Sequence, residues 1–286
     1  MATYQLHNTA LSVEVSDLGA AIQSVRTPGG TEFIWEGDPA VWAGRAPILF
    51  PICGGLKNDT YFLGDKEYHQ QKHGFIRFET FTPVLSEPDR LVLEARDNAE
   101  TRKTFPFSFV FRVTFSLQEN RLAVTYEVEN TDNRTMYFSF GAHEGYATPE
   151  GVAAYEMHFE KEEKLSTVVL HGNLLSDTER EPVMEGKLLP LDPSYFTVDA
   201  LVFETLSSRA VTLARRGGGR QVRVEFPGFD HLLLWQKYDA KYLCIEPWCG
   251  MPDFESADGH IEHKRYITAL PAGETYVRTH TLTFSE

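Results

Sequence analysis

The chain has 286 residues, of which 42% are hydrophobic and 24% are charged, and its formal net charge at pH 7 is -14. An acidic protein lacks the basic surface that DNA or RNA binding requires, although two or three local cations could still hold a small anion. No apolar run is long enough to span a membrane, the first residues lack the features of a signal peptide, and three cysteines cannot form a disulfide framework. We therefore expect a cytoplasmic protein with no nucleic-acid or membrane partner.

The apolar content is sufficient for one large core, and large β-sheet folds commonly reach this length as one domain. We find no shift in composition, no Pro/Gly/Ser-rich linker and no low-complexity tract that would divide the chain. The sequence therefore predicts a single domain over residues 1–286.

Alternation of apolar and polar residues dominates the first half of the chain. Short alternating runs occupy 11–15 ("LSVEV") and 91–95 ("LVLEA"). In "FSFVFRVTFSL", residues 107–117, six apolar side chains share one face, which predicts a long, half-buried strand. A second run follows at 121–128 after the turn-like "SLQEN", so the two are expected to form an antiparallel hairpin.

The second half of the chain continues this pattern. The segment 193–203 ("PSYFTVDALVF") is the best candidate for a short helix. The three glycines at 217–219 precede an alternating run at 221–226, which indicates a hairpin turn, since a phosphate-binding loop would precede a helix. More continuously apolar strands are expected at 231–235 ("HLLLW") and 242–246 ("YLCIE"). Many strands, few helices and no βαβ rhythm predict an all-β fold, a large antiparallel β-sandwich.

The stretch "KYLCIEPWCGMPD" places an acid inside an apolar run. If 242–248 is a strand, then Cys244, Glu246 and Trp248 share one face. Pro247 cannot donate to a sheet ladder, so we expect regular pairing to fail just after the glutamate. This would place the carboxylate at the rim of a sheet, beside an indole whose face could serve as the floor for a sugar ring.

The cysteines around this acid raise the alternative of a metal or redox pair. Cys244 and Cys249 have no matching second pair, since only Cys53 remains, and zinc sites usually show closer spacing. In "GHIEH", His260 and His263 flank an acid, but the surroundings are loop-like and no third ligand is evident, so we interpret the segment as a solvated loop. We predict no metal site.

Two histidines stand in positions suited to chemistry. His143 follows an apolar strand and a glycine in "FSFGAHEGY", and His73 precedes a glycine in "QKHGFIR". A histidine in such a place is often held only by turn hydrogen bonds, so neither position alone indicates catalysis. We assign no role to the other eight, among them His280.

Taken together, four blocks resemble one known family. The segments "GRAPILFPICGGLKND", "KHGFIR", "FGAHEGY" and "CIEPWCGMPD", in this order, are similar to those of the aldose 1-epimerase (galactose mutarotase) family, in particular its LacX-like branch. The resemblance extends from "VSDLGAAIQSV" to the final strands. It implies a galactose mutarotase-like β-sandwich and an isomerase that exchanges α and β anomers of free or phosphorylated hexoses with no metal or other cofactor.

The resemblance also implies roles for individual residues. Glu246 matches the family's catalytic base, His143 its catalytic acid and His73 its second, substrate-positioning histidine. Asp230, in "PGFDH", is a weaker match to the acid that contacts sugar hydroxyls. Trp248 is added as a substrate-binding residue from its place beside Glu246.

The chain departs from galactose mutarotases before the first histidine. Those proteins carry an Asn-Arg pair where this chain has "GGLKND", with Lys57 near the place of the arginine. Instead, "GRAP" and "HGFIR" resemble hexose-6-phosphate mutarotases, which makes Arg45 and Arg77 candidates for phosphate contact, since the guanidinium fork suits that group. Both arginines could equally pair with acids of this acidic protein.

Exchange of anomers requires that the ring opens, which removes a proton from the anomeric hydroxyl and adds one to the ring oxygen. A base and an acid must therefore act on the same unit of the sugar. Histidine ordinarily titrates near ~6.5, and burial among Ile245, Pro247 and Trp248 would raise the pKa of Glu246 and make it a better base. We expect Glu246 and His143 to face each other across a pocket as wide as a pyranose.

Other classes of function remain open at this point. The partner is expected to be a small sugar or sugar phosphate, and the protein a monomer or a homodimer. A carbohydrate-binding β-sandwich without catalysis could use Trp248, Phe75 and Tyr146 as a platform, but it would need no titrating groups. A metal-dependent β-barrel enzyme would lose its activity with a chelator.

Overall fold

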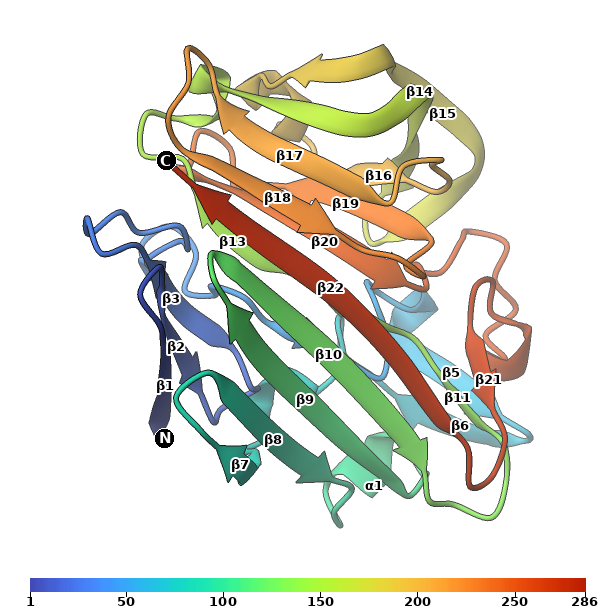
Figure 1. The fold of residues 1–286 in the computed structure, drawn as a ribbon. Helices are drawn as coiled ribbons and strands as arrows, with labels where there is room; N and C mark the ends of the chain where they lie inside the picture. Colours follow the sequence, from blue (N-terminus) through green and yellow to red (C-terminus); the bar gives the residue numbers. More distant parts are fainter.

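A computed structural model describes residues 1–286 of the protein. The larger of two main sheets has nine strands: β7 (Thr82–Ser86), β8 (Arg90–Arg96), β9 (Phe109–Gln118), β10 (Arg121–Asn130), β14 (Tyr155–His171), β15 (Leu174–Pro190), β17 (Ala210–Arg215), β18 (Gln221–Glu225) and β22 (Thr275–Ser285). Their order in the sheet is β15-β14-β17-β18-β22-β10-β9-β8-β7. Figure 1 shows these strands crossing the molecule as one long, twisted layer.

The second main sheet has six strands: β4 (Ile48–Leu49), β12 (Phe140–Ala142), β13 (Glu144–Ala147), β16 (Leu201–Phe203), β19 (His231–Trp235) and β20 (Tyr242–Cys249). The order is β16-β19-β20-β12-β4, and β13 also pairs with β20. All strand pairings in the two sheets are antiparallel. The predicted large antiparallel β-sandwich is confirmed.

Smaller elements surround the sheets. Three further sheets contain β1 (Thr3–His7), β2 (Ser12–Ser16) and β3 (Ile22–Arg26); β5 (Thr60–Leu63) and β6 (Lys66–His69); and β11 (Met136–Phe138) and β21 (Thr268–Leu270). The helices are η1 (Lys57–Asp59), η2 (Ile76–Phe78), α1 (Thr101–Thr104), η3 (Val152–Ala154), η4 (Pro193–Phe196) and η5 (Ile261–His263). None of these helices has the length and apolar character that a membrane-spanning helix needs.

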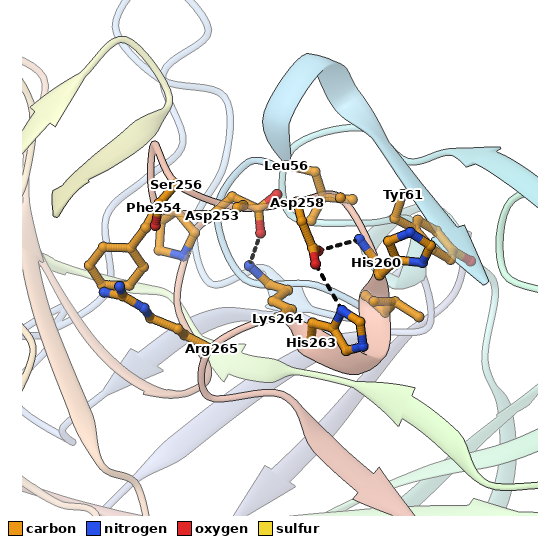
Figure 2. A pocket seen from close by; sticks show the side chains of 14 residues that line it. Leu56, Tyr61, Asp253, Phe254, Ser256, Asp258, His260, His263, Lys264 and Arg265 are labelled. Carbon is orange, nitrogen blue, oxygen red and sulfur yellow. Dashed lines mark hydrogen bonds and ion pairs between the residues drawn. The ribbon is translucent and has the colours of Figure 1, made fainter. Parts of the chain in front are cut away.

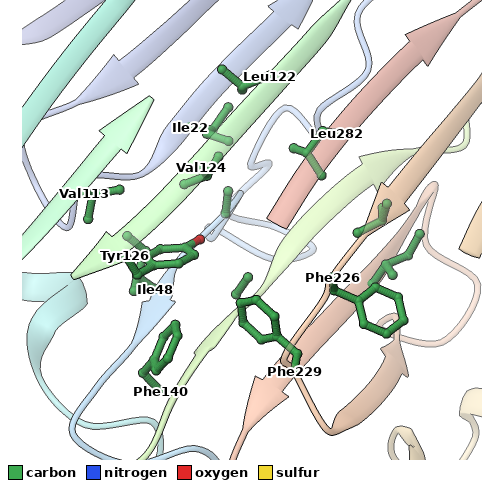
Figure 3. Close-up of a cluster of buried hydrophobic side chains, with 14 of the residues drawn as sticks. Ile22, Ile48, Val113, Leu122, Val124, Tyr126, Phe140, Phe226, Phe229 and Leu282 are labelled. Carbon is green, nitrogen blue, oxygen red and sulfur yellow. The ribbon is translucent and has the colours of Figure 1, made fainter. Parts of the chain in front are cut away.

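The core lies between the two main sheets. One cluster of 59 buried residues includes side chains from β9, β10 and β22 of the larger sheet and from β4 and β12 of the smaller one. In Figure 3, Tyr126 of β10 lies close to Ile48 and Phe140 of the smaller sheet, and its ring centroid is 5.3 Å from that of Phe140. The alternation seen in the sequence is the cause, because it gives each strand of the larger sheet one continuous apolar face.

The strand predictions can be checked in detail. The hairpin of β9 and β10 pairs in register from Gln118 and Arg121 outward, as the alternation and the "SLQEN" turn predicted. The three glycines at 217–219 form the turn between β17 and β18, each with φ between 83° and 93°, so the predicted hairpin is confirmed. The predicted helix at 193–203 is right only for η4, since 201–203 is the strand β16.

Strand β20 lies inside the smaller sheet, with β19 on one side and both β12 and β13 on the other. The expected failure of pairing at Pro247 is wrong on the β19 side, where pairing continues through Leu232 and Pro247 to His231 and Trp248. On the other side the ladder is interrupted between the pairs Gly141–Trp248 and Glu144–Ile245. A proline has no N–H to donate, and the interruption lies beside Pro247.

Candidate active site

Glu246 and His143 are neighbours across the interruption in the ladder. The pairs Gly141–Trp248 and Glu144–Ile245 keep a single register, so residue 143 stands opposite residue 246. On the other side of β20, Leu233 stands opposite Glu246. Side chains directly opposite each other in an antiparallel sheet have Cβ atoms about 4.5–5.5 Å apart. The sheet itself therefore brings together the acid and the imidazole that the sequence singled out.

The two side chains are in direct contact. His143 Nε2 lies 3.3 Å from Glu246 Oε2, and the side chains are only 10% and 2% exposed. They line the same cavity, but side by side on one wall rather than on opposite sides of a gap as wide as a pyranose. The cause of this difference is the cross-strand register, which could not be derived from either segment alone.

Burial shifts the titration of both groups away from the charged forms. It raises the pKa of Glu246 well above its ordinary value, and the nearby positive charge of Lys72 opposes this shift. Burial lowers the pKa of His143 to about 3, and the charges of Arg77 and Lys72 add to the effect. The prediction from the sequence, an imidazole that titrates near its ordinary pKa, is therefore wrong. The aromatic rings of Trp42 and Trp235, with centroids 5.4 Å and 5.8 Å from that of His143, account for its desolvation.

His73 is fixed in one tautomer by its own loop. Its Nδ1 accepts a hydrogen bond of 3.1 Å from the backbone N–H of Gly54, so the proton of the neutral ring is on Nε2. Its ring meets those of His143 and Trp248 edge-on, at centroid distances of 5.6 Å and 5.7 Å. The next residue must be a glycine, because a Cβ on Gly74 would lie 2.2 Å from a backbone oxygen. His73 therefore presents one N–H donor at the site.

We expect His73 to remain neutral, with its proton on Nε2, from about pH 5 to 8. Burial and the charges of His143, Lys72 and Arg77 all hold the pKa of this ring well below its ordinary value. The ¹⁵N shifts of its two ring nitrogens, measured across this range, should stay constant and differ as in the Nε2–H tautomer. A midpoint between pH 6 and 7, as for an exposed histidine, would contradict the assignment. The exposed His263, whose pKa the carboxylate of Asp258 raises, should titrate in the same spectra and is the internal control.

Three tryptophans form the walls around the pair, and two glycines make room for them. Trp248 is 2% exposed and its Nε1 donates to the carbonyl oxygen of Ala142 at 3.2 Å. A Cβ on Gly141 would lie 2.3 Å from the indole of Trp248, and a Cβ on Gly145 would lie 2.9 Å from that of Trp42. Trp248 and Glu246 line the same cavity, as expected for residues on one face of a strand, but sequence reasoning missed Trp42 and Trp235.

The cavity that these residues line has a volume of about 640 Å³. Its other walls come from loops that are distant in sequence: the tip of the β14–β15 hairpin, the segment from η4 to β16, the turn between β19 and β20, and the loop that carries His73. Phe75 and Tyr146, the other two members of the platform considered above, lie in the core and do not line this cavity. The arrangement is a deep pocket rather than a flat aromatic platform.

Of the two arginines considered for phosphate contact, only Arg77 lines the cavity. Its Nη2 donates to the carbonyl oxygen of Lys72 at 2.9 Å, and its Nε is buried without a partner in the protein. Arg45 lies outside, because its Nη1 donates to the carbonyl oxygen of Gln23 at 2.7 Å. Lys72 and Lys237, which sequence reasoning missed, also line the cavity.

Two further sequence assignments need correction. The ammonium of Lys57 donates to the carbonyl oxygens of Glu255 and Ala257, so it is used within a loop outside the cavity. Asp230 is 72% exposed, lies 3.9 Å from Arg209 and is not part of the cavity. The acid that does line the cavity, apart from Glu246, is Asp199, on the segment between η4 and β16.

One group of side chains has the composition of a metal site. Donor atoms of His143, Cys244 and Glu246 lie within 4.8 Å of one another, and all three residues are buried. Metal binding requires a thiolate, whereas burial raises the pKa of Cys244 well above its ordinary value. The positive charges of Lys72 and Arg77 also oppose a divalent cation. The local electrostatics therefore disfavour a metal ion at this position.

The "GHIEH" segment lies in a separate, smaller cavity of about 160 Å³, shown in Figure 2. Asp258 accepts a hydrogen bond from the backbone N–H of His260 and contacts His263 Nδ1 at 2.8 Å. His263 is exposed and His260 is partly exposed. The same figure shows Lys264 bound to Asp253 inside the protein. Asp258 thus holds both histidines, and the predicted solvated loop contains the short helix η5, in which Ile261 is buried.

Comparisons with known proteins show which family and which solved structures this chain is similar to. The family model described as aldose 1-epimerase matches residues 2–283. The chromosomal protein LacX of Lactococcus lactis subsp. lactis is 32% identical, over 98% of this chain and 99% of that protein. A galactose mutarotase related enzyme from Lactobacillus acidophilus has a TM-score of 0.96 and 32% identity, covering 100% of this chain and 98% of the other. A galactose mutarotase-like protein from Lactobacillus casei has a TM-score of 0.94 and 26% identity, covering 99% and 100%.

Proposed function

This chain belongs to the aldose 1-epimerase family of isomerases, and from that premise we propose that it exchanges the α and β anomers of an aldohexose at Glu246 and His143. The observation that carries the proposal is the contact of 3.3 Å between these two buried groups at the wall of a cavity. Both oxygens that exchange protons during ring opening are bonded to C1 of the sugar. Two groups side by side can therefore serve them at the same time.

The pair works as a unit that carries one exchangeable proton. The group that carries this proton acts as the acid, and the other group acts as the base. Ring opening passes a proton to the ring oxygen and takes one from the anomeric hydroxyl, which exchanges the roles of the two groups. Rotation about the C1–C2 bond follows, and ring closure on the other face of the aldehyde restores the original state. Because the groups are coupled, their titration belongs to the pair rather than to either residue.

The surrounding residues suit the binding of a sugar. The neutral Nε2–H of His73 can donate to a hydroxyl or to the ring oxygen without adding a charge. Trp248, with Trp42 and Trp235, offers apolar surface to the C–H faces of a pyranose, and Asp199 offers a carboxylate to its hydroxyls. We assign substrate binding to these side chains and not to Lys57 or Asp230.

Polarimetry of freshly dissolved α-glucose or α-galactose tests the proposed activity. We expect the protein to accelerate the approach to the equilibrium rotation, and a chelator to leave the rate unchanged. A protein that binds the sugar but leaves the rate of mutarotation unchanged would be a carbohydrate-binding module instead. A loss of rate with the chelator would indicate a metal-dependent enzyme.

A second candidate substrate is a hexose 6-phosphate, which the cations of the cavity favour. At about 30 Å³ for each non-hydrogen atom, the volume of a water molecule in the liquid, a hexose needs at most ~360 Å³. The cavity of about 640 Å³ therefore leaves room for a further group. Lys72 and Arg77 line it, so an anionic group in that space would meet two positive charges.

If the phosphate is a substrate group, Arg77→Ala should raise KM for glucose 6-phosphate about 10–100-fold, as the loss of a charged hydrogen bond predicts. The KM for glucose should change little. Arg45→Ala is the matched control, since that guanidinium lies outside the cavity and should leave both values unchanged. Equal losses for both sugars in Arg77→Ala would contradict a role in reading the phosphate.

A further inference from the structure

A group of buried polar side chains behind the site is not used in the proposed chemistry. Glu144 follows His143 in the chain, but alternation along the strand turns its side chain to the opposite face, into the core between the main sheets. There it meets His280 of β22, one of the histidines to which the sequence analysis assigned no role. The Glu144–His280 contact thus joins the two sheets directly behind the wall that carries His143 and Glu246.

The side chains of Glu144 and His280 are buried and close together. His280 Nε2 lies 3.2 Å from Glu144 Oε1, and the side chains are 0% and 4% exposed. The ring of His280 stacks on Tyr126 with a centroid distance of 5.6 Å and an interplanar angle of 9°. Glu144 Oε2, both ring nitrogens of His280 and the hydroxyl of Tyr146 have no hydrogen-bond partner within the protein, so the approach of His280 to Glu144 is close without forming a hydrogen bond. Such groups are rare in folded cores, and each calls for an explanation.

Stability does not supply that explanation. A buried contact between polar side chains is often no more stabilising than apolar side chains of the same size, because both groups lose their hydration. The surrounding core, with Phe140 and Phe229 next to Tyr126 and His280, could accept apolar residues at these positions. The pair is therefore better explained by an effect on its neighbours across the strand.

The position of the pair lets it act on the site. Glu246 is faced by His143 from the β12–β13 connection, by Cys244 from its own strand, by Lys72 and His73 from one loop and by Asp199 from another. Leu233, from β19, is apolar.

The carboxylate of Glu144, next to Ile245 in the register, adds a negative charge behind the strand, which raises the pKa of Glu246. The groups that face Glu144 itself are His280, Tyr126 and Tyr146.

We propose that Glu144 and His280 are positioning residues for the site: their buried approach supports the strand next to His143, and the Glu144 carboxylate places a negative charge behind Glu246. This inference rests on the proposed anomer exchange. A negative charge behind the catalytic pair disfavours the loss of protons from the pair. Removal of this charge should therefore move both limbs of the pH profile to lower pH.

The test is the pH dependence of kcat/KM for mutarotation by the full chain. In Glu144→Gln, the whole bell-shaped profile should shift to lower pH by about half to one unit, with KM changed less than about twofold. Glu144→Asp, which keeps the charge, should retain the limbs of the wild type. Glu144→Met fills the same space in the core with an apolar side chain and should show the same shift as Glu144→Gln. If Glu144→Gln does not fold, Glu144→Met takes its place in the test.

A matched control separates this effect from general damage to the core. Glu163 is another buried glutamate, which accepts backbone hydrogen bonds from Ser207 and Ser208 far from the cavity. Glu163→Gln should lower the melting temperature but leave both limbs in place. Limbs in Glu144→Gln and Glu144→Met that coincide with those of the wild type would overturn the proposal. Absence of mutarotation in the wild type would instead overturn the proposed function.

Discussion

We expect Glu246→Gln to lower kcat for anomer exchange by about 10²–10⁴-fold, the contribution typical of one acid/base group. The amide keeps the size of the side chain but can neither accept nor carry the transferred proton. His143→Asn should produce a loss of the same order, because the two groups share one proton at a separation of 3.3 Å. Polarimetry with α-glucose and α-galactose measures both losses.

Two features of the variants make this prediction specific. Because the groups act as a unit, the double variant should be little worse than either single variant. Cys249→Ser and Cys244→Ser should keep activity within a few-fold of the wild type; the thiol of Cys249 lies 3.7 Å from the carbonyl oxygen of Gly228, away from the cavity. Full turnover by Glu246→Gln, or a large loss in Cys244→Ser alone, would refute the assigned roles.

The largest effect on stability is expected at the buried pair of Asp253 and Lys264. Lys264 Nζ lies 2.6 Å from Asp253 Oδ1, and the side chains are 4% and 5% exposed (Figure 2). The other carboxylate oxygen accepts a hydrogen bond of 2.9 Å from the backbone N–H of Lys57. Lys264→Met would leave the carboxylate buried with its charge unpaired, which costs about 3–5 kcal/mol of unfolding free energy.

Urea unfolding of Lys264→Met against the wild type measures this loss. Lys103→Met is the matched control, because its partner Glu100 and Lys103 itself are 77% and 64% exposed, and such surface pairs contribute at most about 1 kcal/mol. Equal unfolding free energies for the two variants would contradict a structural role of the buried pair. Asp253 belongs to the "CIEPWCGMPD" block. The expected loss of stability in Lys264→Met would therefore assign Asp253 a structural role rather than a catalytic one.

Much of the fold could be predicted because each long strand carries its own signal. The alternation in 107–117 and 121–128 sufficed to predict β9, β10 and their hairpin. The same rule placed Glu246 and Trp248 on one face of β20, and both do line the cavity. The effect of Pro247 was misjudged because a missing N–H affects one side of a strand, whereas the sequence does not say which neighbour lies there.

The site was harder to predict, because most of its walls come from loops. Glu246, His143 and His73 stand in recognisable blocks, and the structure places all three at one cavity. Lys72 could have been noticed from its place directly before His73, and Trp235 from its place at the end of "HLLLW". Nothing in the local sequence of Asp199 or Trp42 distinguishes them, since tertiary packing alone brings them to the cavity.

Three residues that the sequence assigns to the site lie outside the cavity: Arg45, Lys57 and Asp230. Arg45 stands in a block that resembles the family, but a single hydrogen bond to the carbonyl oxygen of Gln23 turns its guanidinium away from the cavity. Lys57 is likewise held by the carbonyl oxygens of Glu255 and Ala257, in the loop that follows β20. Asp230 follows "PGF" at the surface, beside the strand that carries the cavity wall. A side chain's place in a motif fixes its backbone position more firmly than its direction.

The central claim is that a sugar lies over the contact between Glu246 and His143 with its anomeric carbon at the pair. A crystal structure of the Glu246→Gln variant with bound glucose or galactose tests it most directly. We predict the C1 hydroxyl and the ring oxygen within hydrogen-bonding distance of the side chains at 246 and 143. A sugar bound elsewhere, or bound in the cavity with C1 directed away from both side chains, would contradict the account.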